Sequence, residues 1–172
     1  MDLSGRCLFP HRKGRIERKE TVDLKNYTGT YTPSFPISAR PMGEIAGYPV
    51  RPGYFEDFGA TLLPVGVNFT VHTHHGTSCE LLLFHKGEEE PYAVLPFPAS
   101  YKIGDVYSMI VFGLNIEEFE YAYRVDGPSN SREGLLFDRK KILLDPYARA
   151  VVGKHAWGEK LEGNYRARVV KD

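Results

Sequence analysis

Three histidines, His72, His74 and His75, form the group in this sequence that could most readily bind a metal. On an extended strand, His72 and His74 share a face, and such a pair can supply two ligands to an ion such as zinc. No third ligand lies nearby, and the stretch HHGTS has the composition of a strand that ends in a turn. We therefore interpret the histidines as polar residues at a strand end and expect no metal site.

Three consecutive carboxylates, Glu88 to Glu90, are the second group with chemical potential. Hydrolysis of a glycosidic bond requires two carboxyl groups that face each other across the substrate. Neighbours in the turn-like stretch KGEEEP fan outward instead, which favours a solvated cluster. The motifs GxSxG, GxxxxGK[ST], GxGxxG and HExxH do not occur. We therefore expect neither catalytic residues nor a cofactor in this chain.

The tyrosines are the remaining candidates for a ligand site, because an aromatic ring offers a flat sugar an apolar platform with a polar tip. The candidates for carbohydrate binding are Tyr107, Tyr92 and Tyr101. In the run GDVYSMIVF, Tyr107 lies on the opposite face from Val106 and Ile110, which favours its exposure. The alternative for each ring is ordinary core packing, which is the commoner use of a tyrosine in such a strand.

The amino-acid composition limits the kinds of partner that the protein is expected to bind. The 172 residues carry 22 Lys and Arg against 22 Asp and Glu, so the charge favours neither nucleic acid nor an anionic membrane. Cys7 and Cys79 lack CxxC spacing, which favours reduced thiols in a cytoplasmic protein. The N-terminal stretch has no apolar signal region, and no run approaches the ~18 apolar residues of a membrane span. We expect a cytoplasmic protein with no nucleic-acid or membrane partner.

Short apolar runs separated by turn residues predict an all-β fold from about residue 47 onward. GVNFTVHT and FEYAYRVD alternate with a period of two, so Phe69, Tyr121 and Tyr123 are expected in a core. CELLLFH is apolar almost throughout, as in a strand buried on both faces, whereas the prolines in YAVLPF indicate an edge strand. Runs spaced about a dozen residues apart are typical of an antiparallel β-sandwich.

Changes in composition and hydrophobic pattern divide the chain into three parts. Residues 1–45 combine a basic cluster with a proline-rich stretch and are expected to form an irregular N-terminal arm. Residues 46–150 hold the strands of the sandwich. Residues 151–172 follow the last strong apolar run and are expected to connect the sandwich to a further domain.

Six motifs together resemble the N-terminal module of bacterial glycogen debranching enzymes of the isoamylase type. They occur in the family's order and cover about residues 47–152. The motifs are Gly59-Ala60-Thr61, Gly66-Val67-Asn68-Phe69, Leu83-Phe84, Gly104-Asp105, Tyr121 to Pro128, and Leu143 to Ala148.

The resemblance implies an immunoglobulin-like β-sandwich of the E-set type, a family-48 carbohydrate-binding module placed before an α-amylase-type (β/α)8 barrel. In such enzymes the barrel hydrolyses α-1,6 branch linkages of glycogen-like glucans. Its motifs do not occur here, and a barrel needs ~250 residues of its own. The resemblance thus implies a non-catalytic module that packs on the barrel of a longer debranching enzyme and helps to shape the substrate cleft.

Glycan-binding members of this module family place one Trp after the Val-Asp-Gly turn and another after the Leu-Phe strand. Here Pro128 to Asn130 occupy the first place, the second offers only Tyr92, and the sole Trp, Trp157, lies beyond the sandwich. This difference favours packing on a barrel over independent binding of an α-glucan such as glycogen or starch. Such binding remains an alternative, as does the equivalent module of a branching enzyme.

The stretch KILLDPYARAV indicates where a partner would bind. Ile142 to Leu144 are expected to finish the sandwich, because Pro146 cannot donate to a sheet ladder. Leu144, Asp145, Pro146 and Tyr147 are then the expected interdomain packing residues. We expect the chain's own catalytic domain to cover them, or a second copy in a homodimer.

Overall fold

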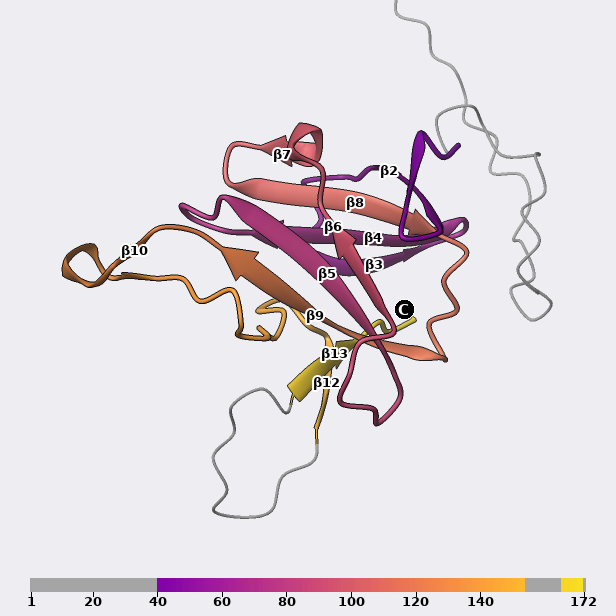
Figure 1. Ribbon diagram of the computed structural model, residues 1–172. Coiled ribbons are helices and arrows are strands. Elements are labelled where there is room, and N and C mark those ends of the chain that lie inside the picture. The colour runs from indigo at the N-terminus through magenta and orange to yellow at the C-terminus, as the bar shows by residue number, and fades with distance from the viewer. Residues whose placement is uncertain (1–39, 154–164, 172) are drawn as a thin grey trace, which may run out of the picture.

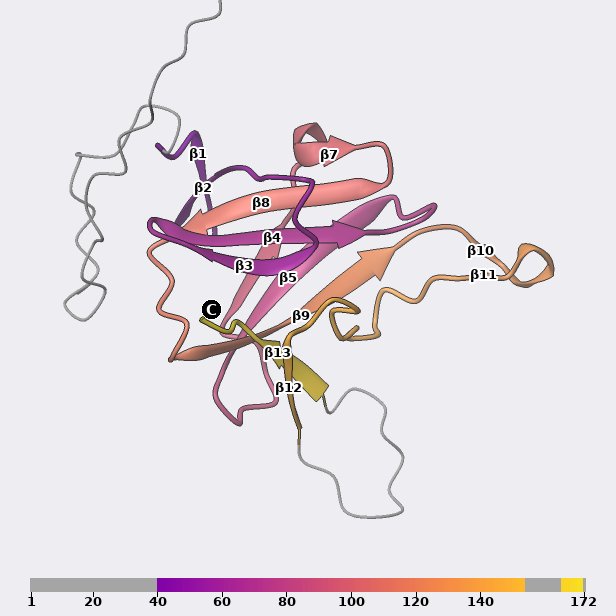
Figure 2. The same ribbon diagram turned by 180° about the vertical axis from the view of Figure 1, so that it is seen from behind.

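The structure of the protein is a computed structural model that describes residues 40–153 and 165–171. In this part of the chain, two antiparallel β-sheets pack face to face (Figures 1 and 2). Their strands are β1 (Gly43–Ile45), β2 (Tyr48–Pro52), β3 (Gly59–Leu63), β4 (Gly66–His72), β5 (Ser78–His85), β6 (Ala93–Pro96), β7 (Lys102–Ile103), β8 (Val106–Phe112), β9 (Phe119–Asp126), β12 (Ala150–Gly153) and β13 (Tyr165–Arg168). A separate hairpin of β10 (Ser129–Asn130) and β11 (Leu135–Leu136) projects from the body.

The first sheet has the order β1-β2-β8-β4-β3, with β7 paired to β8. The second sheet has the order β12-β13-β9-β5-β6. The expected edge position of the proline-containing run is confirmed, because β6 ends its sheet in the described residues. The strands of each sheet pair in antiparallel fashion. The inward-facing side chains of the two sheets meet between them and form the core. The expected all-β, immunoglobulin-like sandwich is confirmed.

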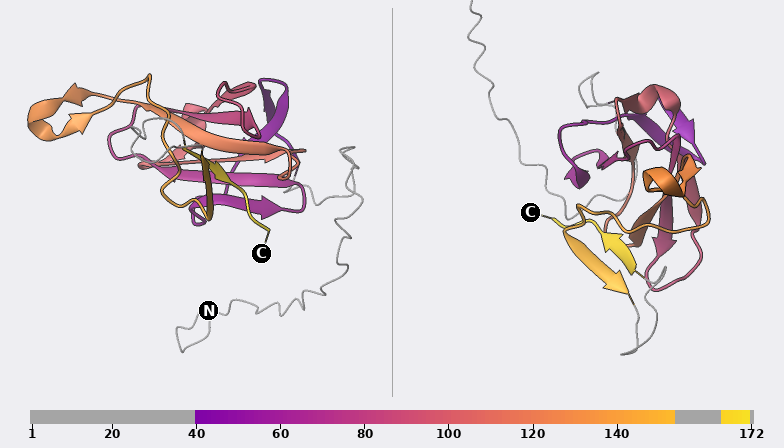
Figure 3. Two further views of the ribbon diagram at one scale, coloured as in Figure 1. Left: turned by 90° about the horizontal axis from the view of Figure 1, so that it is seen from below. Right: turned by 90° about the vertical axis from the view of Figure 1, so that its left-hand side faces the viewer.

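The sheets reach further along the chain than the sequence patterns indicated. β1 lies in the expected arm and pairs with β2. β12, which begins at Ala150, and β13 lie almost entirely in the expected connector, and they pair with each other beside β9 (Figure 3). The sequence missed these strands because each is only three or four residues long. Such short runs show no clear alternation, and long-range pairing rather than local pattern forms them.

The core lies between the two sheets and consists of the residues that face inward from alternate positions. Phe69 and Tyr121 are at most 1% exposed and pack with their ring centroids 5.2 Å apart. Tyr123 is equally buried, so the expected core roles of these three residues are confirmed. In β5, Leu81 and Leu83 face this core, while Leu82 and Phe84 belong to a smaller cluster on the outer face. The strand is therefore buried on both faces, as its composition predicted.

Tyr107 belongs to the core, so the prediction that it lies on the surface is wrong. Its side chain is 2% exposed and its ring meets that of Phe97 edge-on at 5.8 Å. Both faces of β8 are apolar, so the local pattern did not decide which one faces inward. The register decides it: Tyr107 pairs with Val71 of β4, and directly opposed residues share a face of the sheet.

Residues 142–148, here called the closing segment, cover the side of the sandwich between β9 and β3. The expected strand at Ile142 to Leu144 is reduced to one bridge, in which Leu143 pairs with Tyr123. β13 pairs with the same strand at Tyr121, two residues before the position that pairs with the closing segment. Beyond the bridge the chain turns toward the first sheet, where Ala148 packs against the core.

Some predictions concern residues that the structure does not describe. They are residues 1–39 of the expected arm, Cys7, and residues 154–164 of the expected connector, which include Trp157. Within the described residues, no helix is long and apolar enough to cross a membrane.

Candidate interdomain surface and aromatic sites

His72 is the last residue of β4, and His74 and His75 lie in the turn that follows it, as their sequence context indicated. His72, His74 and His75 are exposed, and the Nδ1 atom of His74 lies 2.9 Å from Oδ2 of Asp105. This hydrogen bond lowers the pKa of the Asp105 carboxyl. No group of three or more His, Cys, Asp or Glu side chains in the described residues is arranged to hold a metal ion.

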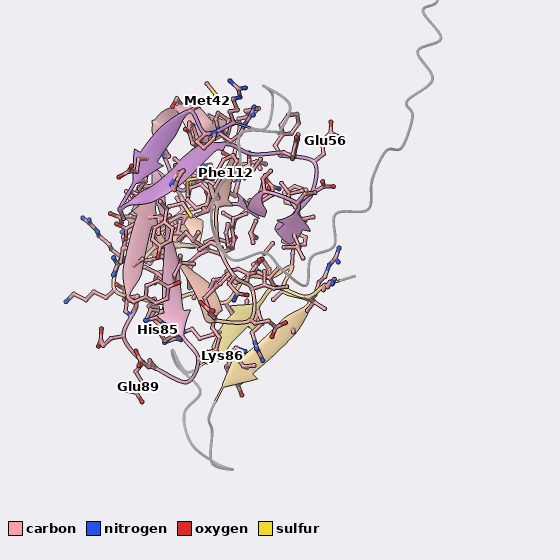
Figure 4. The ribbon with its side chains drawn as sticks, turned by 90° about the vertical axis from the view of Figure 1, so that its right-hand side faces the viewer. Met42, Glu56, His85, Lys86, Glu89 and Phe112 are labelled. Carbon is pink, nitrogen blue, oxygen red and sulfur yellow. The ribbon has the colours of Figure 1, made fainter. Side chains whose placement is uncertain are left out.

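The carboxylates Glu88 to Glu90 are exposed at the turn that follows β5, in accordance with the interpretation as a solvated cluster. Figure 4 shows Glu89 at the outside of the sandwich beside His85 and Lys86. The backbone oxygen of Glu89 accepts a hydrogen bond from Arg166 Nη2 at 3.3 Å. The guanidinium of Arg166 also lies over the ring of Phe84, 4.0 Å from its centroid. This turn is thus tied to β13.

Of the three candidate carbohydrate-binding tyrosines, Tyr92 is the most exposed. It is 38% exposed, and its ring stacks on that of His85 with the centroids 4.2 Å apart. Burial raises the pKa of the Tyr92 hydroxyl, and the neighbouring Tyr48 adds to the shift. Tyr101 packs half-buried against the core, and Tyr107 is inside it. The structure therefore does not bring the three rings together on one surface.

The closing segment contains a buried carboxylate between exposed apolar residues. Leu144 is 37% and Tyr147 48% exposed, and Pro146 is also exposed. Asp145 is 1% exposed, so its side chain does not face a partner as the sequence interpretation expected. Tyr121 donates its hydroxyl hydrogen to Asp145 Oδ2 at 2.7 Å, and the backbone N–H of Tyr147 donates to Oδ1 at 2.8 Å. The carboxylate therefore fixes the turn that displays Tyr147.

Tyr147 reaches the first sheet through Phe58, which precedes the edge strand β3. The two rings stack with centroids 4.9 Å apart and planes inclined by 21°. Gly59, the residue after Phe58, adopts a φ of +88°. A Cβ added to it would lie 3.1 Å from Cβ of Tyr147. Glycine is suited to this position because other residues disfavour positive φ and would crowd the tyrosine.

The loop that carries Phe58 is fixed by two buried polar residues of β4. Asn68 accepts the N–H of Tyr54 on Oδ1 at 2.9 Å and donates from Nδ2 to the oxygen of Tyr54 at 3.1 Å. The hydroxyl of Thr70 donates to the same oxygen at 2.8 Å. Both side chains are fully buried, although they point away from the core. The loop between β2 and β3 therefore crosses over β4 and is held there.

The sequence patterns did not identify Phe58, Asn68 or Thr70 as part of a site. Asn68 and Thr70 alternate with core residues, and alternation assigns such polar residues to solvent. One signal was available, because asparagine is depleted in strand interiors, and its presence in the middle of β4 suggests a specific hydrogen-bonding role. The stack of Phe58 on Tyr147 joins residues far apart in sequence and has no local signal.

The two packed antiparallel sheets define an immunoglobulin-like β-sandwich. Residues 57–148 match the sequence profile of carbohydrate-binding module 48 (isoamylase N-terminal domain). The chain belongs to this family, in agreement with the motif-based prediction.

Similar proteins are glycogen debranching enzymes, isoamylases and pullulanases. The glycogen debranching enzyme of Serratia proteamaculans is 36% identical over 116 residues, which are 67% of this chain and 17% of that protein. Isoamylase SU1, chloroplastic, from Zea mays is 32% identical over 61% of this chain and 14% of its own length. The structure of a Group B Streptococcus pullulanase in complex with maltotetraose shares the fold, with a TM-score of 0.50 and 18% identity over 69% of this chain and 15% of that one.

The chain spans about a sixth of the length of the curated relatives that it matches. The matched region in those proteins therefore accompanies a much larger remainder.

Proposed function

We propose that this chain is the non-catalytic N-terminal module of a glycogen debranching enzyme. In the proposed assembly, it packs against a (β/α)8 domain that hydrolyses α-1,6-glucosidic branch linkages and helps to shape that domain's substrate cleft. The observation that carries the proposal is the family match over residues 57–148, together with relatives named as glycogen debranching enzymes. Those names also favour a debranching over a branching enzyme as the parent.

The exposed apolar residues of the closing segment support the packing role. Leu144, Pro146 and Tyr147 are the proposed interdomain contacts, and Asp145 supports them from inside. Exposed apolar residues that cluster in this way commonly mark a protein interface. We also propose a cytoplasmic location, with which the free and buried thiol of Cys79 is compatible.

The proposal is tested with a chimaeric enzyme in which this chain replaces the aligned region of the Serratia proteamaculans debranching enzyme. We expect the 172-residue chain alone to release no reducing ends from amylopectin, and the chimaera to debranch it. An enzyme in which the region is deleted should lose activity at a lower temperature than the chimaera. Reducing-end release by the chain alone, or a chimaera no better than the deletion, would contradict the proposal.

Binding of an α-glucan by the module itself is the second candidate function, and the exposed ring of Tyr92 favours it. The stack with His85 orients this ring, and 38% of the Tyr92 residue is exposed to solvent. In affinity electrophoresis through gels that contain glycogen, the chain should then be retarded. Tyr92→Ala should lose most of the retardation, because stacking on an aromatic ring is worth roughly 1 kcal/mol or more.

The matched control is Tyr54→Ala, which removes another exposed tyrosine at a different place on the molecule. Equal retardation of the Tyr92→Ala variant and the unaltered chain would eliminate Tyr92 as the sugar contact. A chain that migrates as fast with glycogen as without it has no glucan affinity of its own, and only the packing role would then remain.

A further inference from the structure

Four exposed aromatic side chains, here called the aromatic ledge, come from two distant parts of the sequence. Tyr54, Phe55 and Phe58 belong to the loop between β2 and β3, and Tyr147 belongs to the closing segment. Their exposed fractions are 54%, 44%, 41% and 48%. The stack of Phe58 on Tyr147 connects the two segments at the side of the sandwich between the sheets. Large aromatic residues are enriched at the centres of protein interfaces.

Buried polar groups hold both halves of the aromatic ledge in place. Asn68 and Thr70 fix the backbone at Tyr54, and Asp145 fixes the backbone at Tyr147. The rings are thus exposed on a rigid backbone rather than carried on a loosely held loop. A surface that is already ordered loses less conformational entropy when a partner binds it. This arrangement is expected of a docking surface.

The groups beside the rings indicate what a protein partner would present to the aromatic ledge. Phe58 and Tyr147 stack with their centroids 4.9 Å apart and form one continuous aromatic surface. Glu56 and Asp57 lie within the same loop and are exposed, and Figure 4 shows Glu56 on a different part of the molecule from His85. A complementary surface would therefore present apolar side chains opposite the rings and Lys or Arg opposite the two carboxylates.

We propose that the aromatic ledge, with Phe58 and Tyr147 at its centre, is the surface on which the catalytic domain of the same enzyme docks. This inference rests on the proposed function, and it extends the contact surface from the closing segment to the loop between β2 and β3. The relatives supply the reason for this occupant, since about five-sixths of their length lies outside the matched region. A domain of that size can cover a surface formed by both sheets.

Hydrogen exchange locates the docked surface without any substitution. Amide exchange is compared between the isolated chain and the same residues in the chimaeric enzyme described above. Backbone amides of residues 53–58 and 145–148 should exchange at least tenfold more slowly in the chimaera. Residues 129–136 of the β10–β11 hairpin, which projects elsewhere (Figure 1), serve as the internal control and should be unchanged.

Substitutions then test the contact itself. In the chimaera, Phe58→Ser combined with Tyr147→Ser should separate one cooperative calorimetric transition into two, because the domains no longer stabilise each other. Both residues are 41–48% exposed and lie outside the core, so the isolated chain should keep its own transition. Leu136→Ser is the matched control, since Leu136 is 74% exposed on the hairpin, and it should leave a single transition.

The outcomes separate this inference from the proposed function. An active chimaera with one transition, and with no protection or effect at the aromatic ledge, overturns the ledge assignment and leaves the proposed function standing. A chimaera that is inactive or unfolds in two steps before any substitution overturns the proposed function. Protection of the aromatic ledge in the isolated chain, together with a dimer in sedimentation equilibrium, identifies a second copy as the occupant and also overturns the proposal.

Discussion

Replacing Phe69 by alanine is expected to lower the free energy of unfolding by about 4 kcal/mol, the largest effect that we expect from a single substitution. Phe69 is fully buried between the sheets, and its ring lies 6.4 Å from that of Phe119 and 5.2 Å from that of Tyr121. Truncation removes the contacts of a whole ring from the point where the two sheets meet. The strands of a sheet cannot move inward to fill such a cavity, because their backbones are fixed in the hydrogen-bonded ladder.

Urea unfolding followed by far-ultraviolet circular dichroism measures this change. Phe58→Ala is the matched control, since it removes the same ring from a position that is 41% exposed. The control should cost less than about 1.5 kcal/mol, which is mainly the value of its stack on Tyr147. If the two alanine variants were equally stable, Phe69 would not lie in the centre of the core.

Replacing Asp145 by alanine is expected to lower the free energy of unfolding by about 3 kcal/mol. The substitution leaves the hydroxyl of Tyr121 and the N–H of Tyr147 without the acceptor that each now has. Tyr121 is 1% exposed, so water cannot readily replace the carboxylate at its hydroxyl. Asp145→Asn keeps an acceptor at this position and should cost clearly less. Equal costs for the two variants would mean that the hydrogen bonds are not what stabilises the closing segment.

The stability of the protein should also depend on pH through Asp145. Burial raises the pKa of its carboxyl above the ordinary value, and the hydrogen bonds from Tyr121 and Tyr147 oppose this only in part. The folded state therefore holds the proton more tightly than the unfolded state does. The resulting stability is complete below the unfolded pKa of about 3.9 and is lost as the pH rises through the folded pKa.

The Asp145→Asn variant does not titrate at this position and isolates the effect. The free energy of unfolding of the unaltered protein, minus that of the variant, should fall as the pH rises from about 3.5 toward neutrality. Urea unfolding at constant ionic strength measures the difference. A difference that grows with pH would show that the hydrogen bonds outweigh burial and that the folded pKa lies below the ordinary value.

The strands of the sandwich were predictable where one local pattern sufficed. Alternation in β4 and β9 gives the same inward residues in the sequence and in the structure, among them Phe69 and Tyr121. The continuous apolar run of β5 is buried on both faces, as predicted. β8 shows the limit of this reasoning. Its two faces are about equally apolar, so only the pairing of Tyr107 with Val71 determines which face lies in the core.

Of the two segments that form the aromatic ledge, only the closing segment was predictable from the sequence. The sequence indicated an interdomain surface around Tyr147 because apolar residues continue past a proline that ends strand pairing. Three of the four residues expected there are exposed in the structure. The other half of the aromatic ledge was not predicted. Phe58 lies in a loop with no periodicity, and Asn68 follows the pattern of a solvent-facing strand residue although it is fully buried.

The sequence by itself determined the fold class and the family, because alternation, turn residues and ordered motifs are local properties of the chain. Only the tertiary structure decided which face of β8 is buried, that β12 and β13 extend the second sheet, and that Phe58 meets Tyr147. Each of these depends on contacts between residues far apart in sequence, and their energies become definite only when the two sheets are packed together.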